Sequence, residues 1–373
     1  MIIVQSVVLD IRMLQHSGIG VYLQGLLEGF CYLEDAPRFV FYGPRHFRAQ
    51  VPERLCELFV IRDLPIYSIR EQVLFPEDLR FYPLFHAPHY NIPLRFRGKI
   101  VVTIHDLNHL VYPENLPGSL HRMYARYMFH EASIRAAHVI VDSEKMRQDV
   151  MSRLGVEPER ITAVPLAVSR SFVPCTNPDE IRAFQKAGKL PERYLFTVGI
   201  NKPHKNFPFL LRTLADLWKS KILDLPLILC VDDGKGGRGF DILVKQLGIA
   251  SCVIFPGKVE RQDMPKLYAG AEALIFPSLY EGFGLPPLEA MKMGVPVICS
   301  NRQPMTDVAG DAALYFDPAS GEELKKALLQ ILTKPNLRAD LVAKGKKNAA
   351  RFDWEQTARG TLKIYQDVLG QEM

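Results

Sequence analysis

Short apolar segments alternate with amphipathic segments along the whole chain. Each apolar segment has the length of a buried strand, and the segments between them place apolar residues at helical spacing. Such alternation predicts a parallel sheet covered by helices on both faces. In the first half, the expected strands are residues 2–9, 99–104, 137–142 and 161–164, with helices at 21–30 and up to 154.

The second half repeats this pattern, and we therefore expect two doubly wound α/β domains. Its expected strands are residues 194–198, 226–231, 252–255, 273–276 and 296–300, with helices at 207–219 and from 286. A chain of 373 residues is also too long for one ordinary core. Residues 171–189 contain prolines and a glycine without a strong strand pattern, so we place a linker there, between a first domain at 1–170 and a second that begins at 190.

Composition and charge narrow the class of protein. Hydrophobic residues make up 48% of the chain and charged residues 23%, which indicates a globular protein and excludes disorder. We expect it to be cytoplasmic, because the sequence begins without a basic leader and has no apolar run of membrane-spanning length. Its six cysteines lack CxxC spacing and are expected to be reduced. The net charge of +5 is compatible with a small anionic ligand and too small to indicate nucleic acid.

Gly18 and Gly20 open the helix expected at 21–30. Glycines allow the backbone to approach a ligand closely, and a helix N-terminus offers free N–H groups to an anion. An ordinary strand-to-helix turn explains the same residues equally well. The segment is not a GxGxxG dinucleotide fingerprint, because Leu23 stands where the third glycine would be.

Histidines after one expected strand and around Pro88 are candidate polar contacts. His105 directly follows residues 99–104, and ligands of open α/β sheets bind at such carboxyl ends. It could donate a hydrogen bond to a sugar hydroxyl, with Asp106 orienting it or facing solvent, or the two could be a satisfied polar pair. His86 and His89 fit the acceptor side of a cleft or ordinary loop positions.

Residues 198–206 run from a strand end into the next expected helix. They contain Gly199, Lys202 and Lys205, and such a loop suits a grip on a diphosphate in which a lysine acts as a mobile charge. Surface lysines are usually only solvated. The position at the carboxyl end of a strand favours Lys205 over Lys202.

The most informative segment is residues 276–293. Its prolines suit the start of a helix and Gly294 suits the end, so we expect a helix from about Pro286 to Met293. Free amides ahead of it come from Phe283, Gly284 and Leu285. Glu281 and Glu289 flank this loop, and carboxylates accept hydrogen bonds from ribose and sugar hydroxyls. Either glutamate alone could be a surface residue near a helix start, but that leaves the glycine loop between them unexplained.

These residues resemble glycosyltransferase family 4. The run EGFGLPPLE at 281–289 matches the family's E-x7-E signature, with SGIG at 17–20, HD at 105–106, DSE at 142–144, PHKN at 203–206, DVAGDAA at 307–313 and FDW at 352–354 in the family's order. The resemblance implies a GT-B fold, in which two Rossmann-like domains face a central cleft. The second domain, here 190–356, would bind the nucleotide sugar and the first the acceptor, with a C-terminal helix at about 357–373 packed on the first domain.

The resemblance also implies residue roles. Glu281 would hold donor-sugar hydroxyls, Glu289 the ribose, Lys205 the diphosphate and His105 the sugar. The donor-binding residues would further include Gly18, Gly20, Gly199, Val259, Phe283, Gly284 and Leu285, with the base against the turn at 257–260. The chain departs from the family at Ile200, where many relatives have arginine. His204, Lys202 or Arg261 could share the diphosphate with Lys205.

Such enzymes transfer a sugar with retention of its anomeric configuration. Because both glutamates are assigned to hydroxyls, we expect front-face substitution, in which Lys205 and the loop amides stabilise the departing diphosphate. We expect no metal and no cofactor besides the nucleotide sugar, because Asp232-Asp233-Gly234 is typical of a strand-end turn, not of a metal-holding Asp-x-Asp.

Resemblance to bacterial polysaccharide mannosyltransferases makes GDP-mannose the first expected donor, with UDP-sugars next, and a glycan or lipid-linked acceptor. Residues 121–137 interleave arginines with apolar residues and suggest at most a weak peripheral contact with a membrane. A phosphorylase or epimerase of similar fold and a non-catalytic nucleotide-sugar binder remain alternatives. An NAD-dependent dehydrogenase lacks its fingerprint here.

Overall fold

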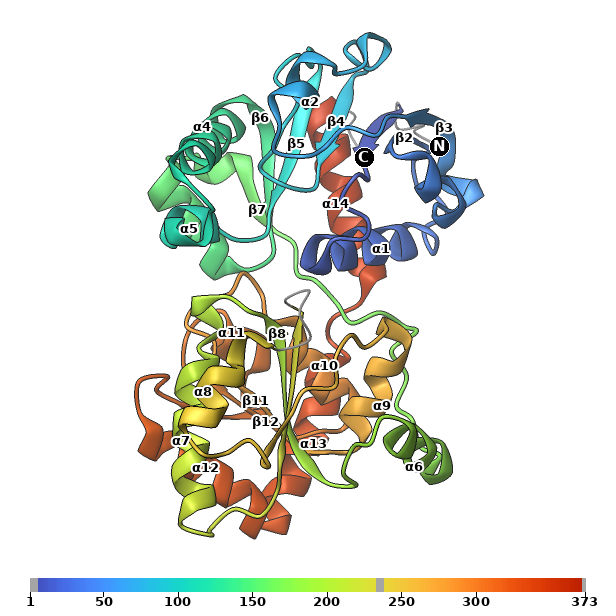
Figure 1. Ribbon diagram of the computed structural model, residues 1–373. Helices are drawn as coiled ribbons and strands as arrows, with labels where there is room; N and C mark the ends of the chain where they lie inside the picture. The colour runs from blue at the N-terminus through green and yellow to red at the C-terminus, as the bar shows by residue number, and fades with distance from the viewer. Residues whose placement is uncertain (1–5, 233–237, 371–373) are drawn as a thin grey trace. The chain divides into compact units, whose positions relative to one another are not determined.

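The computed structural model describes residues 6–232 and 238–370, which divide into two compact units. The first unit comprises Met1–Ser169 together with Phe352–Met373, and the second comprises Arg170–Arg351. The end of the chain therefore returns to the first unit, as the red helix α14 in Figure 1 shows.

The described part of the first unit contains a seven-stranded parallel sheet with the strand order β3-β2-β1-β4-β5-β6-β7. Every position of β1 and β4 is buried, as expected for central strands covered on both faces. The strands are β1 (Val7–Asp10), β2 (Phe39–Gly43), β3 (Cys56–Ile61), β4 (Leu84–Ala87), β5 (Lys99–Ile104), β6 (Ala136–Val141) and β7 (Ile161–Ala163).

Helices cover both faces of this sheet (Figure 1). On one face, α1 (Ser17–Phe30) packs against α14 (Trp354–Leu369); on the other lie α4 (Ser119–Arg135) and α5 (Glu144–Leu154). The α1–α14 contact is close, because a Cβ added at Gly25 would lie 2.0 Å from the Trp354 ring. Two short helices, α2 (Ile69–Val73) and α3 (Asn108–Val111), lie in the long connections between strands.

The second unit is built around a parallel sheet of six strands among its described residues, in the order β10-β9-β8-β11-β12-β13. The two central strands, β8 and β11, are neighbours, and their carboxyl ends lie at the same edge. The strands are β8 (Tyr194–Ile200), β9 (Leu227–Asp232), β10 (Val253–Ile254), β11 (Ala271–Phe276), β12 (Val297–Ser300) and β13 (Ala313–Phe316).

Two groups of helices enclose the second sheet (Figure 1). One face carries α7 (Phe207–Lys219), α8 (Asp241–Gln246) and α12 (Gly321–Thr333), whose apolar residues join the strands in one large core. The other carries α9 (Met264–Ala269), α10 (Leu285–Met293) and α13 (Pro335–Ala349). The remaining helices are α6 (Pro178–Ala187) and α11 (Met305–Ala309).

The predicted fold class is confirmed: both units are α/β with parallel sheets. Two expected segments differ in detail. Residues 178–187 of the expected linker form α6, which is amphipathic and belongs to the second unit. Helix α10 begins at Leu285, one residue before the expected start. The expected turn after Asp232 lies outside the described residues.

Candidate active site

Two loops of the second unit meet beyond the carboxyl ends of β8 and β11. After β8, the 3-10 helix Pro203–Lys205 leads into α7; after β11, residues 277–284 lead into α10. The loops are joined by a backbone hydrogen bond of 2.7 Å from the amide of Leu279 to the carbonyl oxygen of His204. The segments that carry the candidate lysine and the candidate glutamate are therefore held side by side.

Lys205 and Glu281 form an ion pair at this edge. The Nζ of Lys205 lies 2.6 Å from Oε1 of Glu281, and the two side chains are only 11% and 13% exposed. The same Nζ lies 5.4 Å from the centre of the Phe276 ring. Gly199 lies beside the lysine: a Cβ added there would lie 3.5 Å from Cδ of Lys205, an ordinary contact, and 3.2 Å from the Phe207 ring, a tight one. A mobile cation and a carboxylate thus converge, as an anionic ligand with hydroxyl groups requires.

The glycine loop ahead of α10 has the shape expected of an anion-binding turn. Gly284 has φ = 102°, a conformation that favours glycine, and α10 begins with the next residue, Leu285. Phe283 is buried and anchors the loop. Prolines occupy the first turn and carry no N–H, so the amides at the start of this helix are those of Gly284 and Leu285.

Glu289 lies in α10 and, like Glu281, is half-buried. The hydroxyl of Tyr268 in α9 donates a hydrogen bond of 2.8 Å to Oε2 of Glu289. Burial raises the pKa of Glu289, while this hydrogen bond and the charge of Arg261 act in the opposite direction. Tyr268 therefore stabilises the carboxylate and orients it. The second oxygen of Glu289 is left to accept a hydrogen bond from a hydroxyl group.

The possible partners of Lys205 differ in position. Ile200 ends β8 and supplies no charge for a phosphate. His204 is buried and Lys202 is half-buried in the same loop. Arg261 begins a 3-10 helix at Arg261–Asp263, two residues after Val259, and its charge reaches Glu289. Arg261 is therefore placed near the expected ribose contact.

His105 in the first unit is paired with Asp142. His105 follows β5 and Asp142 follows the neighbouring strand β6, and the imidazole Nδ1 lies 2.8 Å from Oδ2 of Asp142. The ring of Tyr22 packs edge-on against His105 with 4.7 Å between ring centres. Asp142, and not Asp106, orients His105; Asp106 instead accepts a hydrogen bond from the amide of Asn108.

The pKa values of His105 and Asp142 are both raised above their usual values. Burial lowers the pKa of His105, but the charge and the hydrogen bond of Asp142 outweigh burial and raise it overall. Burial raises the pKa of Asp142, opposed by His105. Nε2 of His105 is buried and makes no hydrogen bond of good geometry among the described residues, although the backbone of Pro88 also acts on the ring and raises its pKa. With Nδ1 held by Asp142, Nε2 is the atom that remains for a ligand.

Gly18 and Gly20 lie in the first turn of α1 and differ in what surrounds them. A Cβ added at Gly20 would lie 2.5 Å from the carbonyl oxygen of Leu14, so glycine is required there by packing. A Cβ at Gly18 would meet nothing within 4 Å, which leaves open space over this helix start.

His86 and His89 have different environments. His86 is fully buried in β4; its ring nitrogens lie 2.5 Å from the hydroxyl of Tyr365 and 2.8 Å from Oγ1 of Thr103. Burial lowers its pKa to about 3. His86 therefore joins α14 to the sheet, and the interpretation as an acceptor contact or a loop residue is wrong for it. His89 is half-buried beyond the end of β4.

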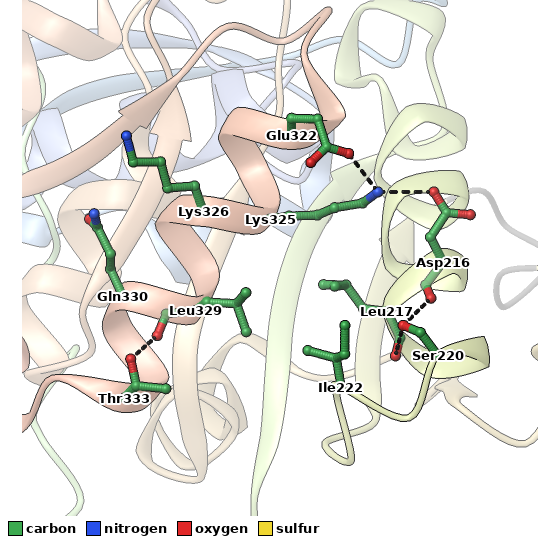
Figure 2. Close-up of a pocket in the computed structure, with 10 residues that line it drawn as sticks. All are labelled: Asp216, Leu217, Ser220, Ile222, Glu322, Lys325, Lys326, Leu329, Gln330 and Thr333. Carbon is green, nitrogen blue, oxygen red and sulfur yellow. Dashed lines mark hydrogen bonds and ion pairs between the residues drawn. The ribbon is translucent and has the colours of Figure 1, made fainter.

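A groove of about 530 Å³ lies elsewhere on the second unit, between α7 and α12 (Figure 2). Asp216 is nine residues beyond Phe207, the first residue of α7, or about 14 Å along a helix of 1.5 Å rise per residue. Lys325 is already paired with Asp216 and Glu322. The groove therefore does not belong to the strand-end site. Its lining residues are Asp216, Leu217, Ser220, Ile222, Glu322, Lys325, Lys326, Leu329, Gln330 and Thr333.

Within residues 6–232 and 238–370, no three His, Cys, Asp or Glu side chains gather as a metal site would require. In the same part of the chain, no helix is long and apolar enough to cross a bilayer.

Two residues of the site are not evident from the sequence. Asp142 is visible only as part of the DSE motif, and its pairing with His105 depends on the adjacency of β5 and β6. Tyr268 belongs to no motif and reaches Glu289 through the packing of α9 on α10. Strand order predicted from the crossovers could have identified Asp142, whereas no signal in the sequence identifies Tyr268.

Comparisons with known proteins identify the family of the chain. Residues 179–348 match the model for glycosyl transferases group 1, and residues 18–172 match the model for glycosyltransferase family 4. The chain is 31% identical to O-antigen chain mannosyltransferase B of Escherichia coli over 94% of this chain and 96% of the relative. It is 27% identical to O-antigen chain mannosyltransferase RfbU of Salmonella typhimurium over 72% and 69%.

Solved structures share the fold. Sucrose-phosphate synthase from Thermosynechococcus elongatus superposes with a TM-score of 0.75 at 20% identity, covering 99% of this chain and all of that one. Anabaena HepE, solved with UDP and glucose, superposes with a TM-score of 0.76 at 16% identity, covering 97% and 100%. The paired strand-end motifs, both family models and a full-length relative thus agree, and the chain belongs to glycosyltransferase family 4, with the GT-B fold and retaining activity of that family.

Proposed function

We propose that the protein transfers mannose from GDP-mannose to a glycan or lipid-linked acceptor in the synthesis of a polysaccharide. The observation that carries this proposal is the Lys205–Glu281 pair at the adjoining ends of β8 and β11. It combines a cation for a diphosphate with a carboxylate for sugar hydroxyls. The choice of mannose and of a polysaccharide is supported by the O-antigen mannosyltransferases that resemble the chain over most of its length.

In the proposed donor complex, Lys205 contacts the diphosphate and the amides of residues 284–285 face its outer phosphate. Glu281 accepts hydrogen bonds from hydroxyls of the transferred sugar, and Glu289, oriented by Tyr268, accepts those of the ribose. The base lies against the turn that contains Val259. His105 donates from Nε2 to a sugar hydroxyl while Asp142 holds its Nδ1.

The reaction proceeds by attack of an acceptor hydroxyl on the anomeric carbon, from the face that the diphosphate leaves. The bond from that carbon to the phosphate oxygen breaks as the new glycosidic bond forms. The hydroxyl proton passes to an oxygen of the departing β-phosphate. Lys205 and the loop amides stabilise the negative charge that develops on this phosphate, so they act most strongly in the transition state.

A thermal-stability panel of nucleotide sugars tests the donor. A ligand at one hundred times its dissociation constant stabilises the folded protein by about 2.7 kcal/mol. We expect GDP-mannose to give the largest rise in Tm and then to support transfer with a chelator present. If a UDP-sugar gives a larger rise in Tm and also supports transfer, that UDP-sugar, and not GDP-mannose, is the donor. Binding without turnover on any acceptor would favour a non-catalytic role.

A further inference from the structure

A group of aromatic and imidazole side chains gathers at the carboxyl ends of β4 and β5 in the first unit. Tyr67 precedes α2, His89 and Tyr90 follow β4, and His109 lies in α3 after β5; we call these four residues the Tyr67 cluster. The ring of Tyr67 lies 5.5 Å from that of His89, 6.0 Å from that of Tyr90 and 6.5 Å from that of His109, measured between centres.

Tyr90 is the fixed part of the cluster. It is buried, its ring stacks on Phe129 with 3.8 Å between centres, and its hydroxyl lies 2.7 Å from Nδ1 of His109. By contrast, Tyr67 and His89 are half-buried, and the Tyr67 hydroxyl lies 3.4 Å from Nδ1 of His89. A contact of that length is a poor hydrogen bond, which the hydroxyl of a ligand could replace at little cost.

Tyr67 is held in an unusual conformation. Its φ is 59°, in the left-handed region that a bulky residue rarely adopts. Such residues persist where surrounding contacts hold them, and they concentrate at ligand sites. The next residue, Ser68, forms a capping box with Glu71, which fixes the start of α2 directly after Tyr67.

Glu71 holds this segment in place. Its carboxylate is buried and accepts hydrogen bonds of 2.6 Å from Nη1 of Arg12, 2.6 Å from Nδ2 of Asn91 and 3.2 Å from the hydroxyl of Tyr124. These donors come from the segment after β1, the segment after β4 and α4. Arg12 is also bound to Asp10, so its charge is already matched by two carboxylates.

The cluster offers the chemistry that a neutral carbohydrate requires. Burial lowers the pKa of His89 well below its usual value, with help from the nearby histidines, and burial raises the pKa of Tyr67. Both side chains are therefore uncharged at neutral pH. Aromatic faces suit the apolar C–H face of a sugar ring, and hydroxyl and imidazole groups suit its hydroxyls.

The cluster also lies near His105. His105 begins the connection that leads from β5 to α3, and it is among the groups whose charge acts on His89. Under the proposed function, His105 contacts the donor sugar, so a second sugar bound beside it is the acceptor. This step rests on the proposed function, whereas the composition of the cluster does not.

We propose that Tyr67, His89 and His109 form the subsite for the acceptor's sugar ring, and that Glu71 is the positioning residue that holds Tyr67 over it. The Tyr67 ring packs on the apolar face of the sugar, and its hydroxyl and His89 exchange their weak contact for bonds to sugar hydroxyls. The ligand class is a neutral pyranoside.

Tyr67→Ala tests the subsite, with Tyr32→Ala as the matched control because Tyr32 is a half-exposed tyrosine of the same unit in the turn after α1. With GDP-mannose as donor and methyl α-mannopyranoside as acceptor, we expect Tyr67→Ala to raise the acceptor KM about tenfold or more, with the donor KM unchanged. Tyr67→Phe should raise it about threefold, and Glu71→Gln should also raise the acceptor KM without changing the donor KM. The tenfold factor corresponds to the loss of the Tyr67 ring contact with the sugar, and the threefold factor to the loss of one hydrogen bond.

The outcomes separate the subsite from general damage. If Tyr67→Ala leaves the acceptor KM within twofold of wild type, or raises the donor KM equally, the proposal is wrong. If that variant does not fold, Tyr67→Phe decides, and an unchanged acceptor KM overturns the proposal. If GDP-mannose is not the donor, saturation-transfer NMR with methyl α-mannopyranoside alone still tests the subsite. The saturation-transfer signal of this sugar should be present with the wild-type protein and with Tyr32→Ala. It should be lost with Tyr67→Ala. A signal retained in Tyr67→Ala, or absent in wild type, would refute it.

Discussion

Glu281→Gln should lower turnover without weakening the binding of the nucleotide product. In the ligand-free protein, Glu281 neutralises Lys205 at 2.6 Å, with both side chains largely removed from water. A glutamine keeps the shape and loses the charge. A hydrogen bond to a charged group is worth roughly 1.5 to 3 kcal/mol, so the weakened contact with the sugar should lower kcat about ten- to a hundredfold.

The same substitution releases Lys205 for phosphate. An ion pair with this burial exceeds an exposed pair in strength, and we take its loss as about 1.4 kcal/mol, which corresponds to about tenfold in Kd. GDP, which has no sugar to lose contact with, should therefore bind as tightly as to wild type or up to about tenfold more tightly. Turnover and GDP affinity should separate in a way that general damage to the site would not produce.

Two assays measure these effects: steady-state transfer for kcat, and calorimetric titration with GDP. Glu322→Gln is the control, because Glu322 also pairs with a lysine, Lys325 at 2.9 Å, but is an exposed residue in the first turn of α12, and its lysine also pairs with Asp216 of α7. Normal turnover in Glu281→Gln would refute the assigned role, as would a loss of GDP affinity as large as the loss in kcat.

Four further predictions concern the rest of the site and the surface. Lys205→Ala should weaken GDP-mannose binding and lower kcat together, since its charge meets the diphosphate before and during departure; titration and kinetics check both. Glu289→Gln should mainly raise the donor KM, because the ribose contact is the same in ground and transition states. For Asp142→Asn, the loss in free energy of unfolding should be largest near about pH 6 and shrink as pH rises through the raised pKa of His105, because the stabilised imidazolium is then lost; denaturation at several pH values tests this sign. Anionic vesicles should bind the protein weakly through α4, where Leu120, Met123 and Tyr127 are exposed beside arginines, and binding that persists at high salt in a sedimentation assay would contradict this.

The sequence pattern predicts the strands and the helix that ends before Gly294, because both depend on the residue types within the segment itself. Continuous apolar runs identify the buried strands, and prolines with a terminal glycine delimit α10 to within one residue. Position at a strand end likewise predicts that Lys205 and Glu281 share one edge, because β8 and β11 are neighbouring parallel strands. Their roles in binding stay predictions.

Contacts that depend on tertiary packing could not be predicted. The residue that orients His105 is 37 positions away along the chain, and Asp106, its direct neighbour, forms a local turn instead. The sequence around Pro88 suggests a loop or cleft position for His86, yet the residue lies in β4 and its partner Tyr365 is 279 positions away in α14. Tyr67 belongs to no motif, and its conformation depends on buried contacts of Glu71 from three segments.

The anomeric configuration of the first product tests the central claim most directly. With GDP-mannose, whose mannose is α-linked, NMR recorded during the reaction should show an α-mannoside on an acceptor glycoside, or α-mannose first when water is the acceptor. Front-face departure assisted by Lys205 requires this retention. A β-configured first product would contradict the mechanism and the assigned roles of Lys205 and Glu281.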